Sequence, residues 1–227
     1  TLSGLLKDNG YTTISNGKVS HNSADMKHTW SEVWDPPQEV TWRNYKLEEN
    51  IENEKSKKEV PAYEAAMVDD DAYFDGQIAT KTISDLIKLK DDGKPFLLFS
   101  GFVKPHLPFN APKKYWDLYD PTEIKFPINK DFPSTAPKRA QTWYELSAYK
   151  DITKNVDVEE KLAKKLIHAY YACVSYIDAQ IGRVLTALDE LGLAKDTIVI
   201  LTSDHGFSLS EHNRWSKHSL FKTELQV

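Results

Sequence analysis

The sequence predicts an α/β fold in which a largely parallel sheet is flanked by helices. Three times in 227 residues, an amphipathic run ends at a glycine and a short apolar segment follows. Glycine is common just past the end of a helix because it adopts a left-handed conformation at little cost. Helices that alternate with strands return the chain to the same edge of a sheet, which makes the strands parallel.

The first two repeats of this pattern are short. Each predicts a helix, a glycine that ends it, and a strand of five or six residues. Their parts are a helix over residues 2–9, Gly10 and a strand over residues 11–15, then a helix over residues 72–90, Gly93 and a strand over residues 95–100.

The third repeat is the longest. Apolar residues recur every three or four positions from Leu162 to Leu191, which predicts one long amphipathic helix that ends at Gly192. The segment Thr197–Leu201 is apolar or β-branched throughout, a pattern typical of a strand buried on both faces of a parallel sheet. Cys173 lies on the apolar face of the long helix, and we expect it in the core.

Two insertions separate these repeats, at about residues 22–70 and 107–157. The first contains a mixed charge run from Glu48 to Glu59, typical of a solvated face, and the second is rich in proline and aromatic residues. Such insertions tend to form the rims of binding sites. We expect residues 1–227 to be part of one domain, and because both ends look cut, an internal piece of a longer protein.

Composition narrows the class of protein. Hydrophobic residues make up 40% and charged residues 28%, with a net charge of −5, as in ordinary globular proteins. The interspersed charges argue against a nucleic-acid partner, and no apolar run reaches the length of a membrane span. A single cysteine excludes an internal disulfide framework.

The end of the third predicted strand carries a candidate metal site. Asp204 and His205 follow it directly, and ligands of open α/β sheets bind just beyond the carboxyl ends of the strands. A carboxylate beside an imidazole suits a divalent cation. The alternative is that Asp204 caps a turn and His205 is an ordinary hydrogen-bonded residue. For Asp69–Asp71, by contrast, we prefer helix capping to metal binding.

Lysines and histidines follow all three predicted strands. Their positions are Lys18, His21, Lys104, His106, His212, Lys217 and His218. Because the ends of parallel strands are neighbours, these cations predict a crevice for a sulfate or phosphate ester, in which lysines neutralise the oxygens and a histidine protonates the leaving group. Taken singly, each remains open to the alternative of an ordinary surface lysine or loop histidine.

Three blocks in this order and spacing carry a resemblance. They are Gly17-Lys18-Val19-Ser20-His21, Lys104-Pro105-His106-Leu107-Pro108-Phe109 and Thr202-Ser203-Asp204-His205-Gly206. Together they resemble the sulfatase family of the alkaline-phosphatase superfamily, most closely its iduronate-2-sulfatase-like branch. The resemblance implies an alkaline-phosphatase/sulfatase-like fold, incomplete in this chain.

The resemblance also implies roles. Asp204 and His205 correspond to ligands of one calcium ion, Lys18 and Lys217 to the lysines that hold the sulfate oxygens, and His21 to the partner of the nucleophile. His106 corresponds to the acid near the leaving oxygen, while His212 and Trp215 lie where substrate contacts are expected. The family nucleophile is a formylglycine made from a Cys/Ser-x-Pro-x-Arg motif that this chain lacks.

From the resemblance we therefore expect the formylglycine, and the remaining metal ligands, upstream of Thr1. The chain alone should be inactive and bind calcium weakly. The expected substrate is a sulfated small molecule or glycan, and family habit favours export, to a periplasmic, secreted or lysosomal location. Two alternatives stay open: a phosphate or phosphonate ester hydrolase of the same superfamily, and a non-catalytic binding protein that kept the fold.

Overall fold

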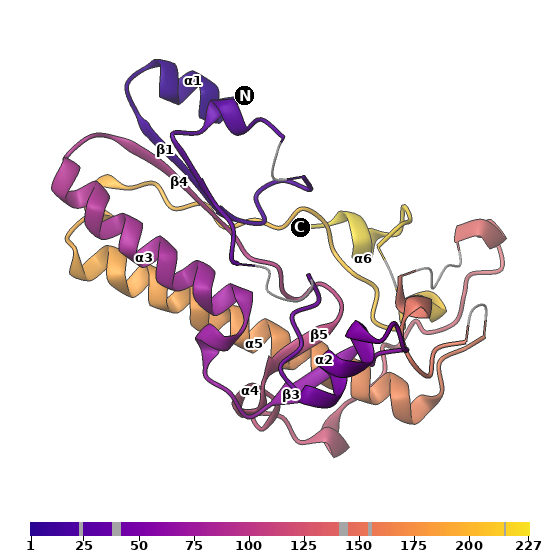
Figure 1. Cartoon of the computed structure of the whole chain (residues 1–227). Helices are drawn as coiled ribbons and strands as arrows, with labels where there is room; N and C mark the ends of the chain where they lie inside the picture. Colours follow the sequence, from indigo (N-terminus) through magenta and orange to yellow (C-terminus); the bar gives the residue numbers. More distant parts are fainter. Residues whose placement is uncertain (23–24, 38–41, 141–144, 154–155, 216) are drawn as a thin grey trace. The chain divides into compact units, whose positions relative to one another are not determined.

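The computed structural model describes residues 1–22, 25–37, 42–140, 145–153, 156–215 and 217–227 (Figure 1). The chain divides into two compact units, which are described separately. Unit 1 comprises Thr1–Asn44, Val68–His106 and Val174–Ile198, and unit 2 comprises Tyr45–Met67, Leu107–Cys173 and Val199–Val227.

The helices and strands alternate through most of the chain. In order they are α1 (Leu2–Asp8), β1 (Thr12–Gly17), β2 (Glu32–Trp34), α2 (Glu48–Lys55), β3 (Tyr63–Ala66), α3 (Phe74–Asp92), β4 (Phe96–Gly101), β5 (Phe109–Pro112), α4 (Lys113–Trp116), α5 (Glu160–Glu190) and α6 (Lys222–Leu225). Short 3₁₀ turns lie at Lys27–Thr29, Asp70–Ala72, Pro121–Glu123, Lys138–Ala140, Leu146–Ala148, Ala194–Asp196 and Glu211–Asn213.

The strand pairing confirms the predicted parallel α/β fold. Unit 1 contains a sheet in the order β2-β1-β4, and unit 2 contains the pair β3-β5. Both strand pairs in the first sheet are parallel, as is the pair in unit 2. Figure 1 shows β1 and β4 side by side, and their register pairs Gly17 with Gly101 at the last position.

The first two predicted repeats are confirmed, with each helix and strand boundary within two residues of the prediction. Gly10 and Gly93 follow α1 and α3 with φ of +87° and +67°, the left-handed conformation that ends these helices. At Gly93 the backbone N–H closes the helix by donating to the Leu89 carbonyl at 3.1 Å. Burial of Ile78, Ala79 and Leu86 on α3 then forms the core of unit 1.

A buried polar network joins α3 to the sheet. The Asp85 carboxylate, fully buried on α3, accepts from the Asn16 amide of β1 at 2.8 Å and from the Lys81 ammonium at 2.6 Å. Lys81 also reaches Glu32 of β2 at 2.7 Å, and the hydroxyls of Thr82 and Ser100 lie 2.8 Å apart. The helix is therefore fixed to all three strands by side chains as well as by apolar packing.

The long helix is also confirmed. Helix α5 runs without a break from Glu160 to Glu190, its first part in unit 2 and its last part in unit 1. In unit 1 the Tyr176 hydroxyl donates to the Asp70 carbonyl at 2.8 Å and accepts from the Gly76 N–H at 2.7 Å. Cys173 is fully buried, as expected of a core residue.

The predicted strand at Thr197–Leu201 is wrong for the structure. Residues 197–203 have no regular secondary structure, and Ile198, Val199, Ile200 and Leu201 are 89%, 55%, 79% and 75% exposed. An apolar, β-branched run indicates that a segment favours a buried environment. A strand forms only where a neighbouring strand supplies its hydrogen bonds. Within the described residues, no strand pairs with this segment.

The helix-capping interpretation of Asp69–Asp71 is wrong as well. Asp69 precedes the 3₁₀ turn without a side-chain cap, and the N-cap of α3 is Tyr73, which makes none either. Asp71 instead accepts from Arg183 at 2.8 Å and from the Thr80 hydroxyl at 2.6 Å. The Asp71 carboxylate therefore links α5 to α3, a tertiary role that the local sequence does not reveal.

Aromatic packing and the buried carboxylate of Glu64 help to hold unit 2 together. The Phe109 ring packs edge-on against Tyr170 and Phe207, with centroids 5.4 and 5.9 Å away. Glu64, 2% exposed, accepts from the Lys46 and Leu47 N–H groups at 2.7 and 3.0 Å, and so fixes the start of α2. Through the described part of the chain, no helix is both long and apolar enough to cross a membrane.

Candidate functional site

The predicted site residues fall into one group in each unit. Lys18, His21 and His106 belong to unit 1, and Asp204, His205, His212, Trp215 and Lys217 belong to unit 2. Each group is built below from the elements that carry it.

In unit 1 the ends of β1 and β4 bring Lys18 beside the segment that carries His106. The Lys18 N–H donates to the Gly101 carbonyl at 2.7 Å, which extends the strand pairing by one residue. A Cβ at Gly101 would lie 2.2 Å from the Lys18 carbonyl carbon, so this approach requires glycine. Lys18 and His21 are both exposed.

His106 lies at the end of a tight turn after β4. Its N–H donates to the Val103 carbonyl at 3.0 Å, and the Lys104 ammonium donates to the His106 carbonyl at 3.0 Å. Lys104 is only 9% exposed, and its ammonium stabilises the turn. His106 is half-buried, and its ring packs edge-on against Trp42 with centroids 5.9 Å apart.

A buried carboxylate lies beneath this turn. Asp75, in the first turn of α3 and 1% exposed, accepts from the Val103 N–H at 2.5 Å and from the Lys104 N–H at 3.3 Å. Burial raises the pKa of Asp75, while the hydrogen bond from Val103 and the charge of Lys104 act in the opposite direction.

In unit 2, Asp204 and His205 form the candidate metal pair. Their Oδ2 and Nε2 atoms are 3.7 Å apart, and His205 Nδ1 lies 2.7 Å from the Gly206 carbonyl. Because a carbonyl can only accept, Nδ1 donates to it, and Nε2 is the ring nitrogen on the side of the Asp204 carboxylate. A metal-binding imidazole likewise donates from one ring nitrogen and binds the metal through the other.

Two donors fit only part of a calcium site. Calcium takes about six to eight oxygen ligands. No group of three or more His, Cys, Asp or Glu side chains placed to hold a metal occurs among the described residues. The pair has donor types that suit a cation but not the number that calcium needs, so further ligands would have to come from other residues.

Lys217 is held by a carboxylate that the sequence did not indicate. Its ammonium lies 3.0 Å from Glu145 Oε1, and the His218 ring lies 3.1 Å from the same oxygen. The Lys217 side chain is only 16% exposed, so its charge is largely shielded from water and paired with the Glu145 carboxylate.

The loop that carries His212 and Trp215 is anchored by a buried ion pair. Arg214, fully buried, pairs with Glu224 of α6 at 2.8 and 3.2 Å. The His212 ring stacks on Phe221 with centroids 4.7 Å apart, and the His212 backbone N–H donates to the Asn129 carbonyl at 2.7 Å. Trp215 is 1% exposed and packs in the core of this unit.

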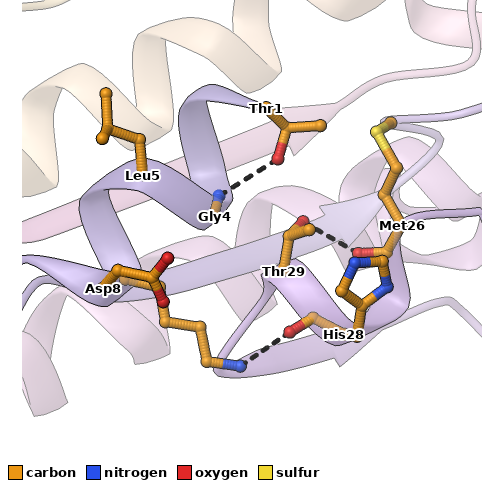
Figure 2. Close-up of a pocket in the computed structure, with 8 residues that line it drawn as sticks. Thr1, Gly4, Leu5, Asp8, Met26, His28 and Thr29 are labelled. Atoms are coloured by element: carbon orange, nitrogen blue, oxygen red, sulfur yellow. Dashed lines mark hydrogen bonds between the residues drawn. The ribbon is translucent and has the colours of Figure 1, made fainter.

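A depression between α1 and the 3₁₀ turn at Lys27–Thr29 holds none of these residues. Figure 2 shows it lined by Thr1, Gly4, Leu5, Asp8, Met26, His28 and Thr29. Lys7 also lines it, and its ammonium donates to the carbonyls of His28 and Trp30 at 2.9 and 2.7 Å. The polar groups there join the first helix to the following chain.

Sequence reasoning missed three residues that support the site: Asp75, Glu145 and Arg214. Asp75 resembles any acidic residue in the first turn of a helix, and its partners lie 28 and 29 positions away. Glu145 meets Lys217 across more than seventy residues. Long-range pairing of this kind leaves no local signal.

Solved structures of other proteins share the fold of this chain. A phosphonate monoester hydrolase from Silicibacter pomeroyi superposes with a TM-score of 0.70 at 16% identity, covering 99% of this chain and 50% of that one. The protein BT4656, solved with its substrate D-glucosamine-2-N,6-O-disulfate, gives a TM-score of 0.64 at 19% identity, covering 100% and 53%.

Sequence comparison identifies the family of this chain. The family model described as Sulfatase matches residues 1–227, and the chain therefore belongs to the sulfatase family. Iduronate 2-sulfatases from Mus musculus and Homo sapiens are each 33% identical over 240 aligned residues, covering 100% of this chain and 44% of those proteins. An arylsulfatase from Clostridium perfringens is 34% identical over 59% of this chain and 26% of its own length.

The chain thus spans less than half the length of the curated relatives it matches most fully.

Proposed function

We propose that the complete protein containing this chain hydrolyses sulfate esters. The observation that carries the proposal is the joined end of β1 and β4, where Lys18 follows one strand and the His106 turn follows the other. Membership of the sulfatase family supports it.

The proposed roles follow from charge. A sulfate ester gains negative charge on its oxygens and on the leaving oxygen as the S–O bond breaks. Lys18 and Lys217 stabilise the sulfate oxygens, and His106 gives a proton to the departing alkoxide. His21 orients or deprotonates the nucleophile, and His212 lies close to the substrate. The burial of Trp215 favours support of this loop over direct contact with the substrate.

The metal and the nucleophile complete the proposal. Asp204 and His205 would hold the cation, which supplies polarisation of the ester when bound. No Cys/Ser-x-Pro-x-Arg motif occurs in these 227 residues, so the proposed formylglycine would come from a part of the protein outside them.

We propose a sulfated carbohydrate as the substrate. Iduronate 2-sulfatases are the relatives matched over the whole chain, and BT4656 shares the fold and was solved with a disulfated glucosamine. Export from the cytoplasm fits such a substrate and belongs to the same proposal.

The test is turnover of an aryl sulfate by the complete protein. Lys18→Ala and His106→Ala should each lower kcat by about 10²–10⁴-fold, the range for an electrostatic or acid–base group. Lys195→Ala, which removes an exposed lysine with 80% side-chain exposure, is the control and should leave kcat unchanged. Unchanged turnover in Lys18→Ala or His106→Ala would overturn the role of that residue.

A phosphonate or phosphate ester is the second candidate, favoured by the superposition on a phosphonate monoester hydrolase. The two reactions separate by kcat/KM for p-nitrophenyl sulfate against p-nitrophenyl phenylphosphonate. A ratio above one supports the sulfatase, and a ratio well below one supports the alternative. Binding of a sulfated sugar without turnover of either ester would identify a non-catalytic protein.

A further inference from the structure

The turn that carries His106 is fastened from inside unit 1. Its first two N–H groups, from Val103 and Lys104, donate to the two oxygens of Asp75 at 2.5 and 3.3 Å. At the other end of the turn, the Lys104 ammonium donates to the His106 carbonyl at 3.0 Å. Asp75 and Lys104 are 1% and 9% exposed, so water competes little for either contact.

The burial of the Asp75 carboxylate must be offset by favourable contacts. Burying an ionised carboxyl group costs several kcal/mol unless hydrogen bonds and opposite charge offset the cost. Asp75 receives both, from two backbone N–H groups and from the charge of Lys104, although burial still raises its pKa. Its position in the first turn of α3 adds the favourable field of a helix N-terminus.

Asp75 does not serve its own helix. Both of its oxygens accept from residues of the turn after β4, which lies 28 or 29 positions further along the chain. Asp85, the other fully buried carboxylate of α3, accepts from Asn16 and Lys81 instead. One helix therefore carries two buried carboxylates, and only one of them holds the His106 turn.

We propose that Asp75 and Lys104 form a buried clamp that positions His106 for proton transfer. Asp75 fixes the start of the turn and Lys104 fixes its end, so the backbone that carries the imidazole is held at both ends. The proposal rests on the proposed function for its catalytic consequence, while the positioning of the ring is a separate structural claim.

The activity test compares two asparagine variants of the complete protein. In Asp75→Asn the amide presents its NH₂ group to one of the two N–H donors, which breaks one contact of the clamp. We expect kcat for an aryl sulfate to fall about 10–100-fold, as when partners that orient an active-site group are removed. KM should change little, because Asp75 does not reach the substrate.

Asp85→Asn is the matched control. It alters an equally buried carboxylate on the same helix, and we expect it to lower the melting temperature comparably while leaving kcat within about twofold of wild type. An equal loss of kcat in both variants would show that Asp75 acts only through stability and would overturn the clamp.

A second measurement does not depend on activity. With ¹³C-labelled histidine, the His106 ring resonance and its titration midpoint should shift in Asp75→Asn but not in Asp85→Asn. If wild type hydrolyses no sulfate ester while this shift is seen, the clamp stands and the proposed function fails. If wild type is active and the His106 resonance is the same in both variants, the clamp fails and the function stands.

Should Asp75→Asn not fold, Lys104→Met tests the other half of the clamp. It removes the ammonium that donates to the His106 carbonyl but keeps the apolar stem. We expect the same direction of change in kcat and in the His106 resonance. A wild-type resonance and kcat in Lys104→Met would overturn the clamp.

Discussion

At the scale of single residues, one buried charge explains how α3 is held against the sheet of unit 1. Asp85 is fully buried and Lys81 reaches it at 2.6 Å from one turn away on α3. The Asn16 amide of β1 donates to the same carboxylate at 2.8 Å. The packing of the helix against the sheet therefore depends on this carboxylate and its cation.

Lys81→Met should destabilise the protein by about 3 kcal/mol, because it leaves the Asp85 carboxylate buried without its cation. Lys88→Met is the control: Lys88 is 3.6 Å from the same carboxylate but its side chain is 64% exposed, and we expect a change below about 0.5 kcal/mol. Urea unfolding measures both. Similar losses in the two variants would contradict the assignment of Lys81 as the main partner.

The same pair has a predictable dependence on pH. Burial alone would lower the pKa of Lys81, but hydrogen bonds to Asp85 and Glu32 outweigh it and raise the pKa above its ordinary value of 10.5. A raised pKa in the folded state means that the stabilisation is complete below 10.5 and is lost as pH rises through the folded-state value. The stability difference between wild type and Lys81→Met should therefore persist at pH 7–9 and shrink above pH 10.5; a constant difference up to pH 12 would contradict this.

Ser210 offers a prediction about the backbone of the His212 loop. Its φ of +82° is a left-handed conformation that costs a residue with a Cβ about 1 kcal/mol. Ser210→Gly should raise the free energy of unfolding by up to about 1 kcal/mol. The control, Ser56→Gly, makes the same change at a φ of −82°, where we expect a small loss. A gain in both variants would point to an effect unrelated to φ.

At the scale of elements, the helices and the first two strands behaved as their patterns predict, and Thr197–Leu201 did not. Helices α1, α3 and α5 satisfy their own backbone hydrogen bonds, so periodicity and a terminal glycine are enough to locate them. A strand depends on a neighbour. Strands β1 and β4 find one in each other, whereas no described strand pairs with Thr197–Leu201.

The exposed apolar segment Ile198–Leu201 should promote association of this chain. Four consecutive apolar side chains without a partner favour association with other apolar surfaces or strand edges. We expect Ile200→Lys to reduce ANS fluorescence and light scattering of the 227-residue chain. Ile128→Lys is the control, since Ile128 is fully exposed but stands alone, and it should change neither signal. Equal effects would show that total apolar exposure, not this segment, causes association.

At the scale of the whole molecule, the chain contains two compact units, and each contains some of the proposed site residues. That residues 1–227 form part of one domain, with insertions at about 22–70 and 107–157, remains a prediction. So do the roles of the eight site residues, which rest on family membership and on the geometry within each unit.

Calcium should have little effect on this chain. With two donors, Asp204 and His205, we expect a dissociation constant of 1 mM or weaker, so 1 mM calcium adds at most about 0.4 kcal/mol of stability. Thermal unfolding with and without calcium measures this, and Asp204→Asn should remove any shift. Asp196→Asn, at an exposed carboxylate, is the control. A shift of several degrees would show that the chain holds a complete site.

The sequence alone was enough to determine the parallel α/β class, three helices with their glycine ends, two of the strands, and the residues that carry the family resemblance. These features depend on local periodicity, on the conformational freedom of glycine and on short motifs. Only the tertiary structure decided that Ile198–Leu201 lie exposed and that Asp70 and Asp71 contact α5 and α3 instead of capping a helix. It also decided that Asp75 holds the His106 turn and that Glu145 pairs with Lys217. The physical reason is the same in each case: a strand, a buried carboxylate and an ion pair all depend on a partner distant in sequence, and only the folded chain supplies it.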